Sequence, residues 1–598
     1  MAEPFSIASI PSGVHEPGVY ITLRTDGDPG LSAPNNRCLI LGYLASGGTA
    51  TADQPIRVLS QDQADVEFRS YSMLAHAYAA AKRQVPVGCE IWCVPLQEPS
   101  SGTAQVVNVE IVGEPSAGVV SAATTAAAAD TMRIKYRGRG IAVSFKAGDA
   151  FTDIALAAKT AWDQFDNMPA VCGRSGAALT FTARHKGAFD DGAVEVSFDS
   201  KGASGVAAKL GTITFSGTAG TTGSATLMMN AKSAQITITS GDAETVSSTG
   251  LVNKLLTGSY PVRAAQPGTP TGVVTLYYAN GRPVRPLGVS IALTSVTVQT
   301  ATASVGTAGA GVPTLTAALT ALGSSDDAYK AWSLFYTSTS ELSATATHIE
   351  TESGVAEGMK GQHAIFCLTN SAAAMATANI PTATTPRLDS SRRYPILWAM
   401  SAANAGWELA ARYAAEIAAE NYVARNFNGM QFIGDDSAPV VPIHPLDRPT
   451  RGERNDAIGL RHSPVSVDSS GNMAVIWAGT SYKPKGFKDA KLVKLSASLT
   501  LDYYNYDLNN TLDVQFRGKK LKANSPARTA NSVTTRSLEE AVYRWARRLD
   551  DADLFDGAEA KRDAIKAAIV VSPTRVDVTA IFAPLADLDI IAVSAILE

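Results

Sequence analysis

Long apolar runs are missing from this chain of 598 residues, and none reaches the ~18–20 residues that a membrane-spanning helix requires. Residues 1–6 lack the basic and apolar regions of a signal peptide, so we expect synthesis and folding in a cytosol. The five cysteines are scattered and odd in number, which favours reduced, packed thiols over a disulfide framework. The net charge of −4 gives no global attraction to nucleic acid or to an anionic membrane.

Motifs of familiar catalytic chemistry are also missing. The sequence holds no Gly-x-Ser-x-Gly elbow of serine hydrolases and no His-Glu-x-x-His zinc motif. The glycines of 42–48 follow an apolar strand, as a phosphate loop would, but without the Lys-Ser/Thr pair, and those of 306–311 have the wrong spacing for a dinucleotide site. Cys89 and Cys93 have no second cysteine pair. We therefore predict no catalytic, cofactor-binding or metal-binding residues.

An enzyme nevertheless stays open as the competing class, namely an α/β hydrolase or transferase with a carbohydrate-binding insertion. His348, beside Glu350, and His363 are the side chains that general base catalysis would use. Lone histidines are weak indications of catalysis, and a purely structural role for each is favoured by about ten to one.

The chain length predicts about three or four domains, and the hydrophobic content of 45% supplies buried cores. Residues 37–44 read as a buried strand, 90–96 as a second, and a helix between them opens with a capping box at Ser60 and Gln63. Its apolar stripe consists of Phe68, Tyr71, Ala75, Tyr78 and Ala79. This strand-helix-strand order is typical of an α/β unit.

The composition changes near residue 102, where alanine, glycine, threonine and serine become abundant. Short alternating strands are predicted at 105–111, 131–136, 141–145, 178–183 and 193–198, with one helix at 152–165. Apolar strands at 273–278, 331–336, 363–368 and 396–400 and a helix at 405–427 mark the return of the α/β pattern, and 434–480 reads as a long loop region. The middle segment therefore reads as an inserted antiparallel module, outward-facing and dispensable for assembly.

The predicted fold class is α/β and α+β, multidomain, with an inserted mainly-β domain and an α+β C-terminal domain completed by exchanged strands. The expected parts are an N-terminal linker arm (1–30), an α/β domain in two pieces (31–101 and 273–480), the insertion (102–272) and the C-terminal domain (481–598). In the last of these, a helix at 537–549 opens with a second capping box, Ser537 and Glu540. Its apolar positions are Leu538, Ala541, Val542, Trp545 and Leu549, and its opposite face carries Glu539, Arg544, Arg547 and Arg548. Those charges indicate either a solvated face or a partner surface.

Apolar alternation also marks residues 16–23 and 588–598. An unpaired strand edge is a template for another chain, so these segments are predicted to be strands exchanged between subunits. The residues that would form them are Val19, Tyr20, Ile21, Leu23, Ile590, Ile591, Val593, Ile596 and Leu597. Pairing of the same strands inside one monomer is an equally favoured alternative.

Taken together, the Pro-Gly-Val-Tyr run at 17–20, the strand-helix-strand at 37–96, the insertion and the apolar final strand resemble contractile-tail sheath proteins, especially those of Mu-like phages. Residues 183–189 also resemble the Arg-x-Lys-Gly turn of that branch. The resemblance implies a non-enzymatic structural polymer without cofactors, in which hexameric rings stack helically around a tail tube.

The same resemblance implies that contraction drives the tube through a host envelope during genome ejection. The implied partners are further copies of the chain, the tail tube protein, and the baseplate and tail terminator proteins, with no direct nucleic acid contact and no membrane insertion. The implied location is the virion tail, and the host cytoplasm during assembly. Because the C-terminal domain lies innermost in this family, Arg544, Arg547 and Arg548 are expected to face the tube. The sheath of a phage-derived bacteriocin or secretion machine is the alternative.

Overall fold

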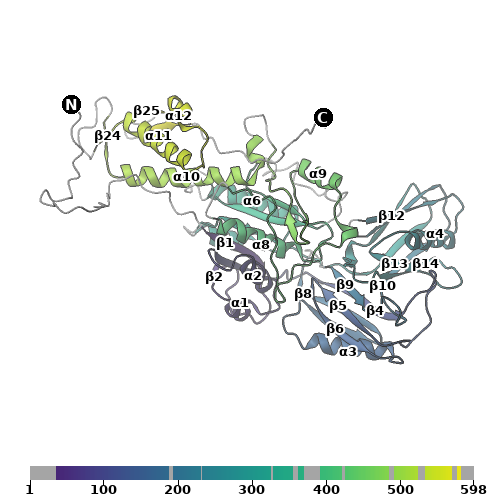
Figure 1. Ribbon diagram of the computed structural model, residues 1–598. Helices are drawn as coiled ribbons and strands as arrows, with labels where there is room; N and C mark the ends of the chain where they lie inside the picture. The colour runs from purple at the N-terminus through teal and green to yellow at the C-terminus, as the bar shows by residue number, and fades with distance from the viewer. Residues whose placement is uncertain are drawn as a thin grey trace, which may run out of the picture.

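The computed structural model describes residues 36–187, 193–229, 232–324, 328–353, 361–369, 391–420, 425–483, 490–522, 532–568 and 576–580. Figure 1 shows three parts: a central α/β part, a large antiparallel part beside it, and a mainly helical C-terminal part at the far end of one long helix. The observed architecture is therefore a mixed α/β multidomain one, as predicted.

The α/β part is built on a mixed sheet with the strand order β2-β3-β1-β18-β19-β20-β21-β22. Its strands are β1 (Arg37–Tyr43), β2 (Ile56–Val58), β3 (Glu90–Leu96), β18 (Ala331–Ser333), β19 (His363–Leu368), β20 (Ile396–Trp398), β21 (Ser463–Val467) and β22 (Met473–Val475). The inner strands run parallel, and β2 and β22 pair antiparallel at the two edges. Parallel strands are covered on both faces, which explains the unbroken apolar run of β1.

The helices of this part differ from the prediction in two places. The single helix expected after Ser60 is two helices, α1 (Gln61–Phe68) and α2 (Met73–Gln84), because Arg69 adopts a φ of 73° that no helix continues through. Ser60 does cap α1, accepting from the Gln63 N–H. Further helices of this part are α5 (Thr316–Gly323), α6 (Thr339–Glu352) and α8 (Gly406–Ala419). The alanines of α8 pack closely against α2.

Residues 434–480 were predicted to be a loop region, and this prediction is wrong. They contain α9 (Arg451–Gly459), which opens with a capping box at Thr450 and Glu453, and also β21 and β22. Both strands are short and buried. Neither therefore shows the alternation of apolar and polar residues that predicts a strand from sequence.

The antiparallel part begins with β4 (Ala104–Gly113), β5 (Asp130–Tyr136), β6 (Arg139–Phe145), β7 (Ala170–Ser175), β8 (Ala178–Lys186), β9 (Val194–Phe198) and β10 (Val206–Ser216). It continues with β11 (Gly223–Met229), β12 (Lys232–Ile238), β13 (Val262–Ala265), β14 (Val273–Tyr278), β15 (Ser290–Thr294), β16 (Thr300–Ser304) and β17 (Gly306–Thr307). Two helices, α3 (Phe151–Asp163) and α4 (Glu244–Thr257), pack on its sheets around one apolar core. The five strands and the helix predicted between 105 and 198 are confirmed.

The strand at 273–278 was assigned to the α/β part, and this assignment is wrong. It forms β14, which pairs antiparallel with β10 and β13. Pairing within this part continues as far as β17, which lies against β4. The predicted boundary at 272 therefore falls inside the antiparallel part. Residues 273–278 are mostly apolar and largely buried, so composition does not distinguish them from a parallel strand.

The C-terminal part is carried by α10 (Leu495–Phe516), whose first turns are buried in the α/β core and whose later turns pack with α11 (Thr535–Asp551) (Figure 1). Its other elements are α12 (Ala558–Lys561), β23 (Lys520–Leu521), β24 (Ser532–Val533), β25 (Lys566–Ala568) and β26 (Asp577–Thr579). The capping box of α11 is Thr534 with Ser537, so the predicted pair of Ser537 and Glu540 is wrong by one turn. Residues 588–598 lie outside the described residues.

Candidate functional site: the buried polar contacts between the parts

The α/β sheet has a topological switch point beside β1, since the chain passes from β1 to β3 on one side and later to β18 on the other. Ligands of α/β proteins bind at the carboxyl ends of strands at such a point. Here Tyr43 ends β1, and its buried ring lies 4.7 Å from that of Phe335 and 5.9 Å from that of His185, measured between centroids. Because His185 belongs to β8, the antiparallel part fills the place where an α/β enzyme would hold its substrate.

His185 also completes the N-terminus of α2. Its Nε2 accepts a hydrogen bond from the Met73 N–H at 2.9 Å, so the ring proton resides on Nδ1, which donates to Glu98 Oε1 at 2.6 Å. Ser72 Oγ accepts from the Ala75 N–H in the same turn. An N-terminal N–H group of α2, a helix of the α/β part, is therefore capped by a side chain of the antiparallel part.

Three arginines of the antiparallel part reach into the α/β part. Arg139 donates to Glu408 Oε1 at 2.5 Å, and Arg282 forms a two-point contact with Asp447. Arg285 donates to the carbonyl oxygens of Ala402 and Asn404 at 2.6 and 2.9 Å. All three side chains are buried, and an ion pair of this kind costs several kcal/mol when one partner is removed.

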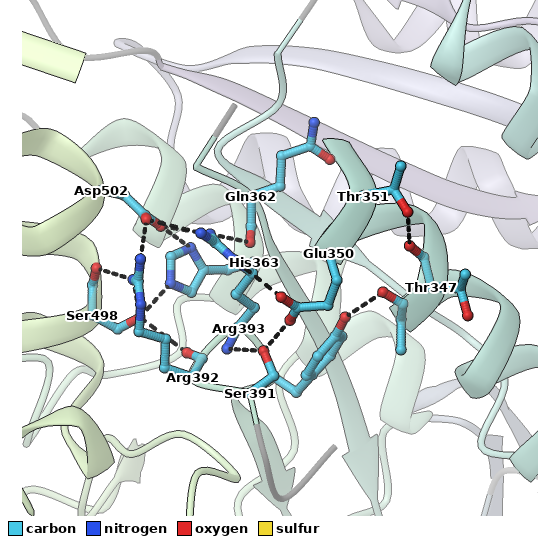
Figure 2. Close-up of polar contacts among 12 residues, drawn as sticks. Thr347, Glu350, Thr351, Gln362, His363, Ser391, Arg392, Arg393, Ser498 and Asp502 are labelled. Atoms are coloured by element: carbon cyan, nitrogen blue, oxygen red, sulfur yellow. Dashed lines mark hydrogen bonds and ion pairs between the residues drawn. The ribbon is translucent and has the colours of Figure 1, made fainter. Parts of the chain in front are cut away.

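A second polar cluster joins α10 to the sheet and is drawn in Figure 2. The carboxylate of Asp502 accepts from both Arg392 and Arg393, the latter at 2.8 and 3.1 Å. Burial alone would raise the pKa of Asp502, but the two guanidinium groups and His363 lower it well below its usual range. Arg392 also donates to the Ser498 carbonyl oxygen at 2.7 Å. These contacts hold the first turns of α10 on the α/β part.

Ser498, His363 and Asp502 have the residue types of a hydrolase triad, but their geometry does not suit catalysis. They connect α10 to the α/β part instead. His363 Nε2 lies 2.9 Å from Ser498 Oγ, yet its Nδ1 is 3.7 Å from Asp502 Oδ2, too far for a hydrogen bond. Burial lowers the pKa of His363 to about 3, despite the nearby Asp502 carboxylate, so the ring is a poor base at neutral pH. Ser498 and His363 are both fully buried, which denies a substrate access to the hydroxyl. The other histidine considered for catalysis, His348, packs beside Trp332.

The three arginines predicted on one face of α11, Arg544, Arg547 and Arg548, differ in exposure. Arg544 and Arg547 are exposed, as expected of either a solvated face or a partner surface. Arg548 instead donates to Asp507 Oδ2 of α10 at 2.6 Å and keeps only 16% of its side chain exposed. Asp507 also accepts from the Trp545 Nε1–H at 2.9 Å. The assignment of Arg548 to the outer face is therefore wrong, because a buried acid on the neighbouring helix draws it inward.

The predicted inter-subunit residues lie outside the described part of the chain. Among the described residues, no group of three or more His, Cys, Asp or Glu side chains is arranged to hold a metal ion. The helices that the structure describes include none long and apolar enough to cross a membrane.

These observations define a multidomain α/β protein whose buried polar side chains, within the described ranges, join its parts to one another. The chain is 29% identical over 187 residues to the Mu-like prophage FluMu tail sheath protein of Haemophilus influenzae, a match covering 30% of this chain and 35% of that protein. The match thus spans about a third of the relative's length. It confirms the resemblance to tail sheath proteins that the sequence indicates. No family model matches the chain.

Solved sheath structures are also similar. The sheath tail proteins of Desulfitobacterium hafniense and Listeria innocua are 12% and 8% identical, with TM-scores of 0.42 and 0.40. These two similarities cover 95% and 92% of this chain, and 96% and 92% of those chains. The contracted helical sheath of the anti-feeding prophage gives a TM-score of 0.38 at 8% identity, covering 97% of this chain and 99% of that chain. These superpositions are loose, and the relationship rests on the sequence match.

Proposed function

We propose that this protein is the subunit of a contractile tail sheath, in a phage or a phage-like injection system. The observation that carries the proposal is the 29% identity to a prophage tail sheath protein. In this role the chain polymerises as stacked rings around a tail tube and contracts to drive the tube through a host envelope. Its partners are further copies of itself, the tube protein, and the baseplate and terminator proteins, and its place is the virion tail.

The protein works without enzymatic chemistry in this proposal. The arrangement at the switch point supports this view, because side chains of Tyr43, Phe335 and His185 pack where a substrate would bind. The buried contacts of Asp502 support it as well, since they join α10 to the sheet and expose no reactive group.

Polymerisation in this proposal uses residues 16–23 and 588–598 as strands that add to neighbouring subunits. Main-chain hydrogen bonds at a sheet edge bind an added strand without requiring a rigid junction between subunits. Contraction then proceeds toward the state in which subunits bury more apolar area. Each Å² of buried apolar surface stabilises that state by about 25 cal/mol.

The orientation we propose places the antiparallel part outward and α11 inward, with Arg544 and Arg547 toward the tube. A contact that has to release on contraction is better made of weak charged pairs, each worth ~0–1 kcal/mol, than of a large apolar patch.

Electron microscopy of the purified protein tests the proposal. The full chain is expected to form tubes or rings in negative stain, whereas a chain lacking residues 588–598 is expected to remain a folded, soluble monomer. Failure of the full chain to polymerise with or without tube protein would overturn the function. Regular tubes from the truncated chain would overturn the strand exchange while leaving the function standing.

A further inference from the structure

Strand β6 forms one edge of the three-stranded sheet β6-β5-β9. It follows β5 through a two-residue turn, Arg137 and Gly138, in which both φ angles are positive, at 55° and 80°. In such a hairpin the residues flanking the turn exchange hydrogen bonds, and every second residue thereafter directs its N–H and C=O outward. On β6 the outward-directed residues are Gly140, Ala142 and Ser144.

The outer edge of β6 carries none of the side chains that usually protect a strand edge. Natural proteins blunt such edges with lysine, proline or a bulge, because an exposed edge accepts another strand. Gly140, Ala142 and Ser144 are instead small and exposed, and among the described residues no strand pairs with β6 on its outer side. A larger residue does not fit at Gly140, because an added Cβ would collide with the Ile134 carbonyl oxygen of β5.

A groove of about 460 Å³ lies along this edge. Its lining includes Gly140 and Ala142 of β6, and Phe165 and Met168, which follow α3 and are apolar. Phe165 remains 49% exposed. Figure 1 shows α3 running beside β6. The groove thus offers backbone groups on one side and apolar surface on the other.

The charged residues of the lining are mostly basic. They are Arg133, Lys135 and Arg139, with a single acid, Asp436. Arg133 pairs with Asp199, which follows β9, and Lys135 pairs with Glu195 of β9; neither acid lines the groove. Arg139 is buried, and its Nε–H has no hydrogen-bond partner among the described residues. This N–H is therefore available to an acceptor, supplied by water or by a bound group.

We propose that this groove binds an extended acidic segment of a partner protein, which adds to β6 as an antiparallel strand. Its side chains alternate between faces. Acidic residues opposite Ala142 lie beside Arg133 and Lys135, and the apolar residues between them pack on Phe165 and Met168. The main chain supplies the hydrogen bonds to the outward groups of β6, and this site is separate from the proposed arms and tube contact.

Fluorescence polarisation with the labelled hexapeptide acetyl-(Val-Glu)₃-amide tests the proposal on the full-length protein. Saturable binding is expected, weakened by salt because the attraction is partly ionic. Opposed residues of antiparallel strands share a face, so the glutamates direct their N–H groups at β6. N-methylation of the glutamates should abolish binding, whereas N-methylation of the valines should preserve it. Equal binding by both methylated peptides, or no saturable binding by the parent peptide, overturns the proposal.

Two matched variants locate the site. Ala142→Glu places a charge like that of the peptide in the groove lining and should weaken peptide binding by about tenfold or more. Val171→Glu adds the same charge to an exposed position of β7 outside the groove and should leave binding unchanged. Circular dichroism confirms that both variants are folded. Equal effects of the two substitutions would place the peptide elsewhere and overturn the assignment.

Discussion

The guanidinium of Arg139 lies 2.5 Å from the carboxylate of Glu408, although 269 residues separate them in the chain. Their side chains are 6% and 1% exposed, and Asn404 donates to the second oxygen of the same carboxylate. Arg139 enters from a hairpin of the antiparallel part, and Glu408 lies in the first turn of α8. The contact between these two parts is therefore buried, and it includes an ion pair.

Removing one member of this pair is expected to be costly. Arg139→Ala should destabilise the protein by about 3–5 kcal/mol, because it leaves Glu408 buried without its cation. Arg133→Ala, in an exposed pair with Asp199, is the control and should cost about 0–1 kcal/mol. Urea unfolding followed by tryptophan fluorescence measures both. Equal midpoints for the two variants would contradict the role assigned to Arg139.

Excision of the antiparallel part should abolish folding of the α/β part. The composition of the insertion suggests a dispensable module, but the contacts described above reverse that expectation. A chain in which a short Gly/Ser linker replaces residues 104–307 loses the partners of Glu408 and Asp447 and the His185 cap of α2. Limited proteolysis and circular dichroism check this outcome. A folded, protease-resistant remainder would show that water or rearranged neighbours satisfy these groups.

Acid should destabilise the protein through its buried histidines. Burial lowers the pKa of His363 to about 3 and that of His462 to about 4. Unfolded histidine has a pKa of ~6.5, so below that pH the unfolded chain binds more protons than the folded one. Stability therefore falls as the pH drops below ~6.5, by about 2 kcal/mol for each histidine at pH ~5.

The variant His462→Leu isolates one of these contributions. Neither ring nitrogen of His462 has a hydrogen-bond partner among the described residues, so the substitution breaks none that the structure describes. The loss of unfolding free energy between pH ~7.5 and ~5 should shrink by about 2 kcal/mol in the variant. An unchanged pH dependence would mean that His462 is already protonated in the folded state.

The three arginines of α11 should separate into two classes. Arg544→Glu with Arg547→Glu should leave the protein folded and weaken its capture by tail tubes, an effect that raised salt reproduces. Arg548→Glu should instead destabilise the C-terminal part, since it places a carboxylate beside the buried Asp507. Co-sedimentation with tubes at low salt and thermal unfolding distinguish these effects. Undiminished tube binding by the doubly reversed protein would remove α11 from the tube interface.

Local pattern determined much of this architecture. Alternation with period two places the strands of the antiparallel part, because one face of each strand is buried and the other is exposed, as in β6 and β8. Helix α3 and the Ser60 cap are equally local, since each is set by residues within a turn or two. The resemblance to sheath proteins also rests on short runs of sequence.

Tertiary structure decided which elements belong together and which way individual side chains point. An apolar strand such as β14 is compatible with either sheet until its neighbours are known, and it joined the antiparallel one. Arg548 stands in sequence among exposed arginines, yet Asp507 of another helix turned it inward. His185 is only the variable position of the Arg-x-Lys-Gly run, and its capping of α2 depends on a contact spanning 112 residues. Such outcomes are set by burial and charge at long range, where the partner of a residue is absent from its own stretch of sequence.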